Sequence, residues 1–335
     1  MILSVDDARR LAETSMVALG HTAPEAGVIA DHLIDCELRG LSSGGLARAV
    51  SIAERIQATM TPRHPIEVLR ETPVSAWIDG GDQVGYLVGR KAADMAIEKA
   101  TTSGLAVVGA KETWYTGMFS YYLEMVTEAG LVGMIAGSGG NIVAPHGGTE
   151  ARFGTNPIAF GFPSTGDPII WDIGTSAVTL AEVLLAIRLG GTLPEGRAYD
   201  KEGQPTTDPL SALGGAFTVW GGHRGSGLAL VVQLLGMLCG AAASPEGLRD
   251  CGFFLMVVDP DLFNPAEDFR QRVSEYADRV RATRPLEPGR PVRVPFDRSA
   301  VTRAERLANG FIEVADEVYD ALATVCGPPL LAEEK

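Results

Sequence analysis

Apolar residues recur at helical spacing through much of the chain. Near the N-terminus, Leu11 and Met16 follow Ser4 and Asp7, which have the spacing of a helix cap, and Gly20 offers a helix end. This pattern predicts a first helix between residues 4 and 20. The same spacing predicts further helices over 24–39, 46–57, 85–100, 176–189, 226–239 and 265–282, and one helical stretch over 299–324.

Short apolar runs between the predicted helices are typical of strands. Such runs cover residues 74–78, 105–108 and 253–258, and the glycine-rich segment 131–162 has the pattern strand, turn, strand. The segment 60–73 is rich in proline and charge and is expected to be a connector. The mixture of helices and strands predicts an α/β fold without internal repeats.

The composition narrows the range of partners. The 335 residues, 46% hydrophobic and 21% charged, are typical of a folded, enzyme-sized chain. A net charge of −14 disfavours nucleic acid and anionic membranes as partners, since binding to either relies on basic residues. The N-terminus has no basic segment followed by an apolar run, and the apolar stretch 228–238 is too short to span a bilayer, so a cytoplasmic location is expected.

Several common chemical motifs are missing from the sequence. The four cysteines lie far apart without metal-ligand spacing, so reduced thiols and no metal site are expected. Neither G-x-G-x-x-G after a strand nor a Walker A motif occurs, which disfavours a Rossmann domain. The segment 40–44 matches G-x-S-x-G, with Ser42 in the place of a hydrolase nucleophile, but that motif needs a preceding strand and a helix is predicted here.

The segment 39–48, Arg-Gly-Leu-Ser-Ser-Gly-Gly-Leu-Ala-Arg, resembles the Arg-Gly-(aliphatic)-x-Ser-His-Gly-x-x-Arg segment of the malate/L-lactate dehydrogenase family, which lies outside the Rossmann superfamily. The family's histidine falls on Gly44. Further similar segments follow in the family's order and span most of the chain: 143–148, 154–159, 172–176, 193–196, 207–209 and 222–229.

The resemblance implies a cofactor domain with a largely antiparallel sheet, a helical region formed by both chain ends, and a homodimer. We therefore expect residues 1–110 with 270–335 to form the helical region for substrate binding and dimerisation. Residues 111–269 are expected to form the NAD(P)-binding domain.

The resemblance also implies a proton relay and a substrate-binding arginine. In the family, a Ser-His pair beside an acidic residue delivers a proton as nicotinamide delivers hydride. Ser43 keeps the serine and Glu182 stands at the acidic position. Arg48 matches the carboxylate-binding arginine, whose forked guanidinium suits a planar carboxylate. Gly44 would border the substrate without donating a proton.

A second departure lies at residues 113–119, where the family has Ser-x-His-x-Gly and Tyr115 replaces another histidine. Thr155 corresponds to a substrate contact. His146, Tyr115 and Tyr121 are candidates for a replacement acid, because each can donate a proton. The resemblance implies NADPH or NADH as cofactor, with these contacts: Tyr115, Thr116, Gly117, Met118, Phe119, Asp172, Ile173, Gly174, His223, Arg224, Gly289 and Arg290.

The missing histidine bears on which substrate suits the site. Hydride addition to a ketone leaves an alkoxide, and a general acid there contributes about 10² to 10⁴ in rate. An iminium carries its proton and charge before hydride arrives, so its reduction depends more on placement and electrostatics. The leading hypothesis is an NAD(P)H-dependent reductase of a C=N bond beside a carboxylate, as in cyclic imino acids, which some family members reduce. The alternatives are a 2-oxo or 2-hydroxy acid dehydrogenase with a relocated acid, and a redox-silent protein with a binding or non-redox role.

Overall fold

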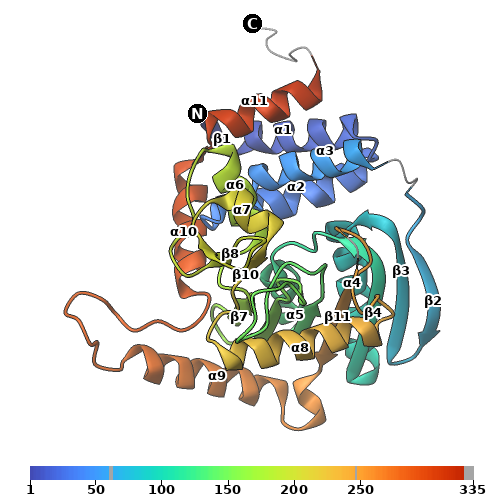
Figure 1. The fold of residues 1–335 in the computed structure, drawn as a ribbon. Helices are drawn as coiled ribbons and strands as arrows, with labels where there is room; N and C mark the ends of the chain where they lie inside the picture. Colours follow the sequence, from blue (N-terminus) through green and yellow to red (C-terminus); the bar gives the residue numbers. More distant parts are fainter. Residues whose placement is uncertain (60–62, 246, 328–335) are drawn as a thin grey trace, which may run out of the picture. The chain divides into compact units, whose positions relative to one another are not determined.

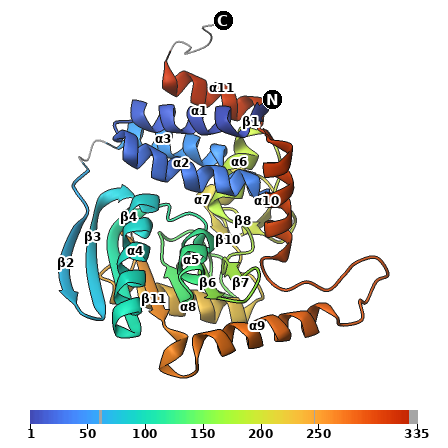
Figure 2. The ribbon, with the colours of Figure 1, turned by 180° about the vertical axis from the view of Figure 1, so that it is seen from behind.

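The computed structural model describes residues 1–59, 63–245 and 247–327. The chain forms two compact units (Figure 1, Figure 2), one from Met1–Pro62, Ala181–Thr192 and Val301–Lys335, the other from Arg63–Leu180 and Leu193–Ala300. Along the sequence, the second unit is inserted into the first. Within the described ranges, no helix has the length and apolar character needed to cross a membrane.

Helices from both chain ends, together with one helix from the middle of the sequence, make up the first unit, and the contribution of both ends agrees with what the resemblance predicted. They are α1 (Val5–Ala18), α2 (Ala23–Leu38), η1 (Ser42–Gly44), α3 (Leu46–Ala58), α6 (Leu180–Arg188), α10 (Asp297–Asn309) and α11 (Asp316–Cys326), of which α6 and α10 begin in the second unit. Strand β1 (Ile2–Ser4) pairs with β12 (Phe311–Glu313), and the Met1 ammonium group donates to the carbonyl oxygen of Val314 at 2.7 Å. These contacts join the two ends of the chain.

The N-terminal helices begin where their capping residues predict. The Ser4 hydroxyl accepts a hydrogen bond from the backbone N–H of Asp7 at 3.0 Å, and Thr22 with Glu25 forms a capping box at the start of α2. The expected single helical stretch over 299–324 is wrong. Gly310 has a φ of +75°, which ends α10, and β12 follows before α11 begins.

A seven-stranded sheet forms the centre of the second unit, in the order β2-β3-β4-β11-β5-β6-β7. All neighbouring strands are antiparallel except β3 and β4. This arrangement confirms the predicted α/β class with a largely antiparallel sheet. The strands are β2 (Glu67–Thr72), β3 (Ser75–Val84), β4 (Leu105–Trp114), β5 (Val132–Gly137), β6 (Ile158–Phe162), β7 (Ile169–Ile173) and β11 (Cys251–Val258).

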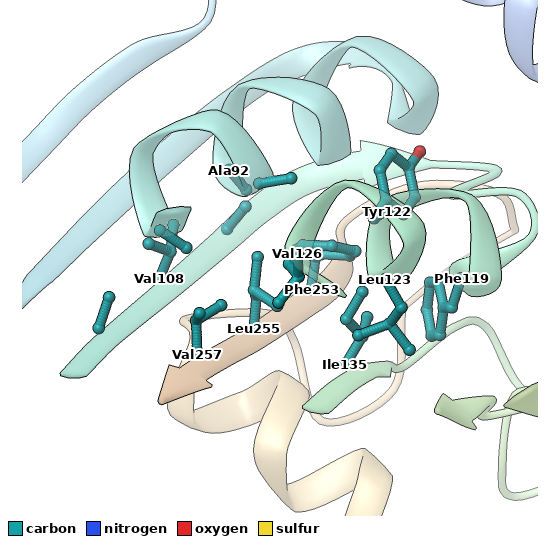
Figure 3. Packing of buried hydrophobic residues seen from close by; sticks show 14 of the residues in the cluster. Ala92, Val108, Phe119, Tyr122, Leu123, Val126, Ile135, Phe253, Leu255 and Val257 are labelled. Atoms are coloured by element: carbon teal, nitrogen blue, oxygen red, sulfur yellow. The ribbon is translucent and has the colours of Figure 1, made fainter. Parts of the chain in front are cut away.

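Helices cover both faces of this sheet. Because side chains alternate along a strand, Phe253 and Leu255 of β11 enter one core with α4 and α5, shown in Figure 3, while Phe254 packs with Val232 of α8 on the other face. The remaining elements of the unit are α4 (Gly85–Ser103), α5 (Phe119–Glu128), α7 (Pro209–Gly214), α8 (His223–Leu238), α9 (Ala266–Arg281), η2 (Pro260–Leu262), β8 (Ala198–Tyr199), β9 (Pro205–Thr206) and β10 (Ala216–Phe217).

The structure differs from two expectations, the connector at the edge of the sheet and the limits of the two domains. The segment 60–73 was expected to be a connector, but residues 67–72 form β2. This edge strand was not predicted because all six of its residues are exposed and lack an apolar alternation. Residues 60–62 of that segment lie outside the described part of the chain. The compact units also divide the chain differently from the expected limits at 110 and 269, since β2, β3 and β4, within residues 67–114, belong to the same sheet as β11.

Candidate active site

The predicted relay segment is a short turn in the first unit. Ser43 and Gly44 lie half-buried in η1, between α2 and α3, and the backbone N–H of Gly44 donates to the carbonyl oxygen of Leu41 at 2.8 Å. A Cβ at position 44 would lie 3.4 Å from Cys36 Sγ, an ordinary van der Waals contact. The backbone therefore admits a side chain at Gly44, and glycine there changes the chemistry more than the fold.

The hydrolase interpretation of Ser42 lacks its structural basis. A nucleophile elbow places its serine between a strand and a helix. Here α2 precedes the turn, and Ser42 is exposed at the beginning of η1. The geometry of this segment is that of a helix-to-helix turn.

Glu37, which the sequence analysis did not single out, lies beside the turn. Its Oε1 accepts a hydrogen bond from the backbone N–H of Leu46 at 2.7 Å, and only 2% of the residue is exposed. Burial raises the pKa of Glu37 to about 7, against the opposing effects of the bond from Leu46 and the positive charge of Arg306. An acidic residue in the last turn of a buried helix, directly before a glycine-rich segment, is the signal that could have identified it.

Arg48 and Glu182 belong to the same unit as Ser43 and Gly44. Arg48 lies in the first turn of α3 and is 9% exposed, so its guanidinium is held in the protein interior. Glu182 is exposed in the first turn of α6. At the other end of α6, Arg188 Nη2 donates to Ser51 Oγ of α3 at 3.1 Å, which fixes α6 against the helix that carries Arg48.

The predicted cofactor loop, residues 115–119, follows β4 in the second unit. Tyr115 has a φ of +49° and Gly117 a φ of +74°, so the backbone turns sharply twice. The Tyr122 hydroxyl donates to the carbonyl oxygen of Thr116 at 2.9 Å, and the Tyr115 ring lies edge-on to Trp114. A strained backbone held by surrounding contacts is typical of a binding site.

Two members of this loop face the core. Met118 is 9% exposed and Phe119 is fully buried, where its ring lies 5.7 Å from that of Phe253. Their side chains support the loop from the side of the core. They therefore contribute to cofactor binding through the conformation of the loop.

Asp172 connects the end of β7 to the beginning of α5. Its carboxylate accepts a hydrogen bond from the backbone N–H of Ser120 at 2.8 Å. Burial raises the pKa of Asp172 to about 6, although the bonds from Ser120 and Phe119 act in the opposite direction. Ile173 ends β7 and Gly174 follows it, and the bond from Ser120 to Asp172 brings this predicted cofactor segment to the end of the loop 115–119.

The turn that contains Thr155 is attached to α8. Asn156 is fully buried, with a φ of +39°, and its side-chain amide donates to the carbonyl oxygen of Ala229 at 2.8 Å and to Gln233 Oε1 at 2.9 Å. The carbonyl oxygen of Thr155 accepts from the backbone N–H of Thr175 at 3.0 Å. These bonds leave the half-buried Thr155 hydroxyl on a fixed backbone.

His146 and His223 lie at the N-terminus of α8. Their ring centroids are 6.2 Å apart, and the backbone N–H of His146 donates to Ser226 Oγ at 3.1 Å. His146, His223 and Arg224 are all exposed, and the helix begins after Gly222, whose φ is +63°. Basic side chains beside the free N–H groups of a helix suit the phosphates of a dinucleotide.

The last predicted contacts are more loosely placed. Gly289 and Arg290 lie in an exposed loop after α9, where Arg290 forms an ion pair with Glu287 at 2.7 Å. Tyr121 is half-buried on α5 and its ring lies edge-on to Tyr122 at 5.6 Å. Across the described ranges, no group of three or more His, Cys, Asp and Glu side chains is arranged to hold a metal ion.

Comparison with known proteins decides the family. Residues 3–323 match the model of the malate/L-lactate dehydrogenase family. The chain belongs to this family. The chain is 31% identical to the L-sulfolactate dehydrogenase of Methanocaldococcus jannaschii over 335 residues, which cover 97% of this chain and 96% of that enzyme.

Two further similarities extend the comparison to an imine reductase and to a solved structure. The chain is 31% identical to the delta(1)-pyrroline-2-carboxylate reductase of Ancylobacter novellus, with 92% of this chain and 93% of the relative covered. The crystal structure of a dehydrogenase from Sinorhizobium meliloti superposes with a TM-score of 0.90 at 30% identity and covers 98% of both chains. The protein is an NAD(P)-dependent oxidoreductase, and a redox-silent role is correspondingly disfavoured.

Proposed function

We propose that the protein is an NAD(P)H-dependent reductase of a C=N bond beside a carboxylate, of the cyclic imino acid type. The observation that carries the proposal is Gly44 at the position of the family's histidine. A ketone needs an acid for the oxygen that becomes an alkoxide, whereas an iminium arrives already protonated. Loss of the imidazole therefore lowers the reaction rate less for an iminium substrate than for a ketone.

The chain's own residues supply binding and orientation. Arg48 receives the substrate carboxylate, since a buried guanidinium offers a fixed pair of donors to a planar anion. Ser43 and Glu182 are the remaining members of the relay, and Thr155 supplies a hydroxyl from a fixed backbone. The nicotinamide cofactor, when bound, supplies the hydride.

The cofactor is held by the second unit. The loop 115–119 and the segment 172–174 receive the nicotinamide half, and His223 and Arg224 bind phosphate at the N-terminus of α8. Gly289 and Arg290 complete the set. NADPH is proposed over NADH by analogy with the family.

A second candidate function is a 2-oxo or 2-hydroxy acid dehydrogenase with a relocated acid. His146 supports it, because its exposed side chain lies next to His223 and is of a type that can donate a proton. Tyr115 and Tyr121 are the other candidate donors. The similarity to an enzyme named for sulfolactate, a hydroxy acid, also favours this alternative.

We further propose a homodimer with an interface on α8 of the second unit, outside the terminal regions where the sequence predicted dimerisation. Helix α8 packs one face against the sheet through Ala229 and Val232, yet its opposite face is also apolar. A second copy of the chain would remove this face from water, as in other oligomer interfaces. The exposed apolar side chains of this α8 outer face, with 41–73% of each exposed, are Leu230, Val231, Leu234, Met237 and Leu238.

The enzymatic proposal is tested with a matched pair of substrates, a cyclic imino acid and the oxo acid of the same carbon skeleton, while nicotinamide absorbance is followed. We expect a kcat/KM for the imino acid at least about tenfold higher. A higher value for the oxo acid would favour the second candidate.

Gly44→His restores the family's donor, and Gly44→Ala is its matched control because it adds a Cβ without a proton. We expect only the histidine variant to gain oxo-acid reduction, by about tenfold or more. A folded Gly44→His protein with no such gain counts against the argument from the missing acid.

A further inference from the structure

Glu37 caps α3 from a different helix. Gly45 is the N-cap residue of α3 and has no side chain to bond the first N–H groups. Glu37 Oε1 takes this role by accepting from the N–H of Leu46 at 2.7 Å, while Oε2 is buried without a hydrogen-bond partner among the residues that the structure describes. A negative group at a helix N-terminus is also favoured by the helix dipole.

The two glycines of the turn differ in what surrounds them. A Cβ at Gly45 would lie 2.2 Å from Glu37 Oε1 and 2.5 Å from its Cδ, so a side chain fits there only if the Glu37 carboxyl group leaves its buried position. A Cβ at Gly44 meets only Cys36, at 3.4 Å. The absence of a side chain at Gly45 therefore leaves the space that the Glu37 carboxyl group occupies. Gly44 does not contribute to this space.

The cap lies close in sequence to Arg48, the proposed substrate-binding residue. Leu46 is the first residue of α3, and Arg48 lies two residues later, with its N–H bonded to the carbonyl oxygen of Gly45 at 2.9 Å. We infer that Glu37 is a positioning residue, which in its ionised form holds the first turn of α3 so that Arg48 receives the substrate carboxylate. The inference rests on the proposed function for the role of Arg48, but the cap itself does not.

The charged groups around Glu37 come from three helices. On α10, Arg306 donates to the carbonyl oxygen of Glu37 and Arg303 pairs with Asp35. On α2, Asp35 also pairs with Arg39, and His32 lies one turn before Asp35. Arg48 is the charged residue in the first turn of α3. Because these surroundings leave the carboxyl group buried, it changes protonation state near neutral pH. The strength of the cap, and with it the placement of Arg48, then depends on pH between about 6 and 8.

The test compares Glu37→Gln with Glu37→Ala, and uses Glu25→Gln as control because Glu25 caps the far end of the same helix. For the native enzyme we expect the KM of the carboxylate substrate to rise several-fold as the pH falls from 8 to 6. Glu37→Gln should show the raised KM at every pH, and Glu37→Ala a rise of about tenfold. The KM of the cofactor and all values for Glu25→Gln should stay within about twofold. An unchanged substrate KM in folded Glu37→Ala, or a native pH trend in Glu37→Gln, overturns the inference.

Two measurements test the cap without turnover. Hydrogen exchange at pH 8 should show that the amides of residues 46–48 exchange faster in Glu37→Gln than in the native chain, relative to the amides of the sheet core, which report global stability. An unchanged ratio overturns the inference even if the enzyme is active. Gly45→Ala should be strongly destabilised, and Glu37→Ala should partly rescue it in the double variant, because the colliding carboxyl group is gone. Purely additive effects contradict the inference, whereas a native protein that reduces neither substrate contradicts only the proposed function.

Discussion

The carboxylate of Asp172 at the end of β7 accepts a hydrogen bond from the backbone N–H of Ser120, the second residue of α5, at 2.8 Å. The loop 115–118 leads directly into α5. The carboxylate therefore caps this helix from a neighbouring strand and fixes the end of the predicted cofactor loop.

Asp172→Ala should lower the free energy of unfolding by about 1 kcal/mol, because the N-terminus of α5 loses its acceptor. It should also weaken binding of the nicotinamide cofactor, measured by titration of tryptophan fluorescence. Asp172→Asn keeps an oxygen acceptor and is the matched control, with a smaller effect on both quantities. Native cofactor affinity in Asp172→Ala would show that the loop is held by other contacts.

Glu37→Gln should remove one pH dependence of stability. Burial raises the pKa of Glu37 from 4.5 to about 7, so the folded state holds a proton that the unfolded chain releases in this range. The stabilisation is fully present below pH 4.5, is lost as the pH rises through 7, and amounts to about 3 kcal/mol. In chemical denaturation, the native protein should lose this amount relative to Glu37→Gln between pH 4.5 and 8. A constant difference between the two proteins would contradict the burial argument.

Asn156→Ala should destabilise the protein by about 2–4 kcal/mol. The change leaves buried acceptors on α8 without their donor and puts alanine at a φ of +39°. Thr155→Val, one residue earlier, keeps the backbone bond to Thr175 and should change stability by less than about 0.5 kcal/mol while raising the substrate KM. Denaturation midpoints and KM values separate the two, and equal midpoints would be the contrary result.

Leu234→Glu should convert the proposed dimer to a monomer. Leu234 is 52% exposed in the middle of the α8 outer face, and a charge there cannot be buried against a second copy. Light scattering coupled to gel filtration measures the mass of each protein. Leu286→Glu, at a residue that is 98% exposed, is the control and should leave the mass unchanged. A dimer that persists in Leu234→Glu would place the interface elsewhere.

Sequence patterns predicted those helices and strands whose buried face shows in the sequence as a regular pattern of apolar residues. The helices beginning at Val5 and Leu46 were predicted within two residues, because each presents a periodic apolar face to the core. Strand β2 was missed because an exposed edge strand has no such pattern.

The candidate site divides in the same way. Ser43, Gly44 and Arg48 were found by their order in one segment of sequence. Glu37 was not, because its role depends on the space that Gly45 leaves open across a turn, and a contact between two helices has no local signature. Asn156 was passed over for its neighbour Thr155, since only the fold shows its bonds to α8.

The pairing of β1 with β12 has a consequence for synthesis of the chain. The first unit contains residues from both ends of the sequence, and its last helix, α11, ends at Cys326. At about 5–20 residues per second, the ribosome completes the inserted unit tens of seconds after it releases α1 to α3. The unit whose first helices are translated earliest is thus the last that can fold completely. During this interval, the apolar faces of α1 and α3 that pack against α11 stay exposed to chaperones.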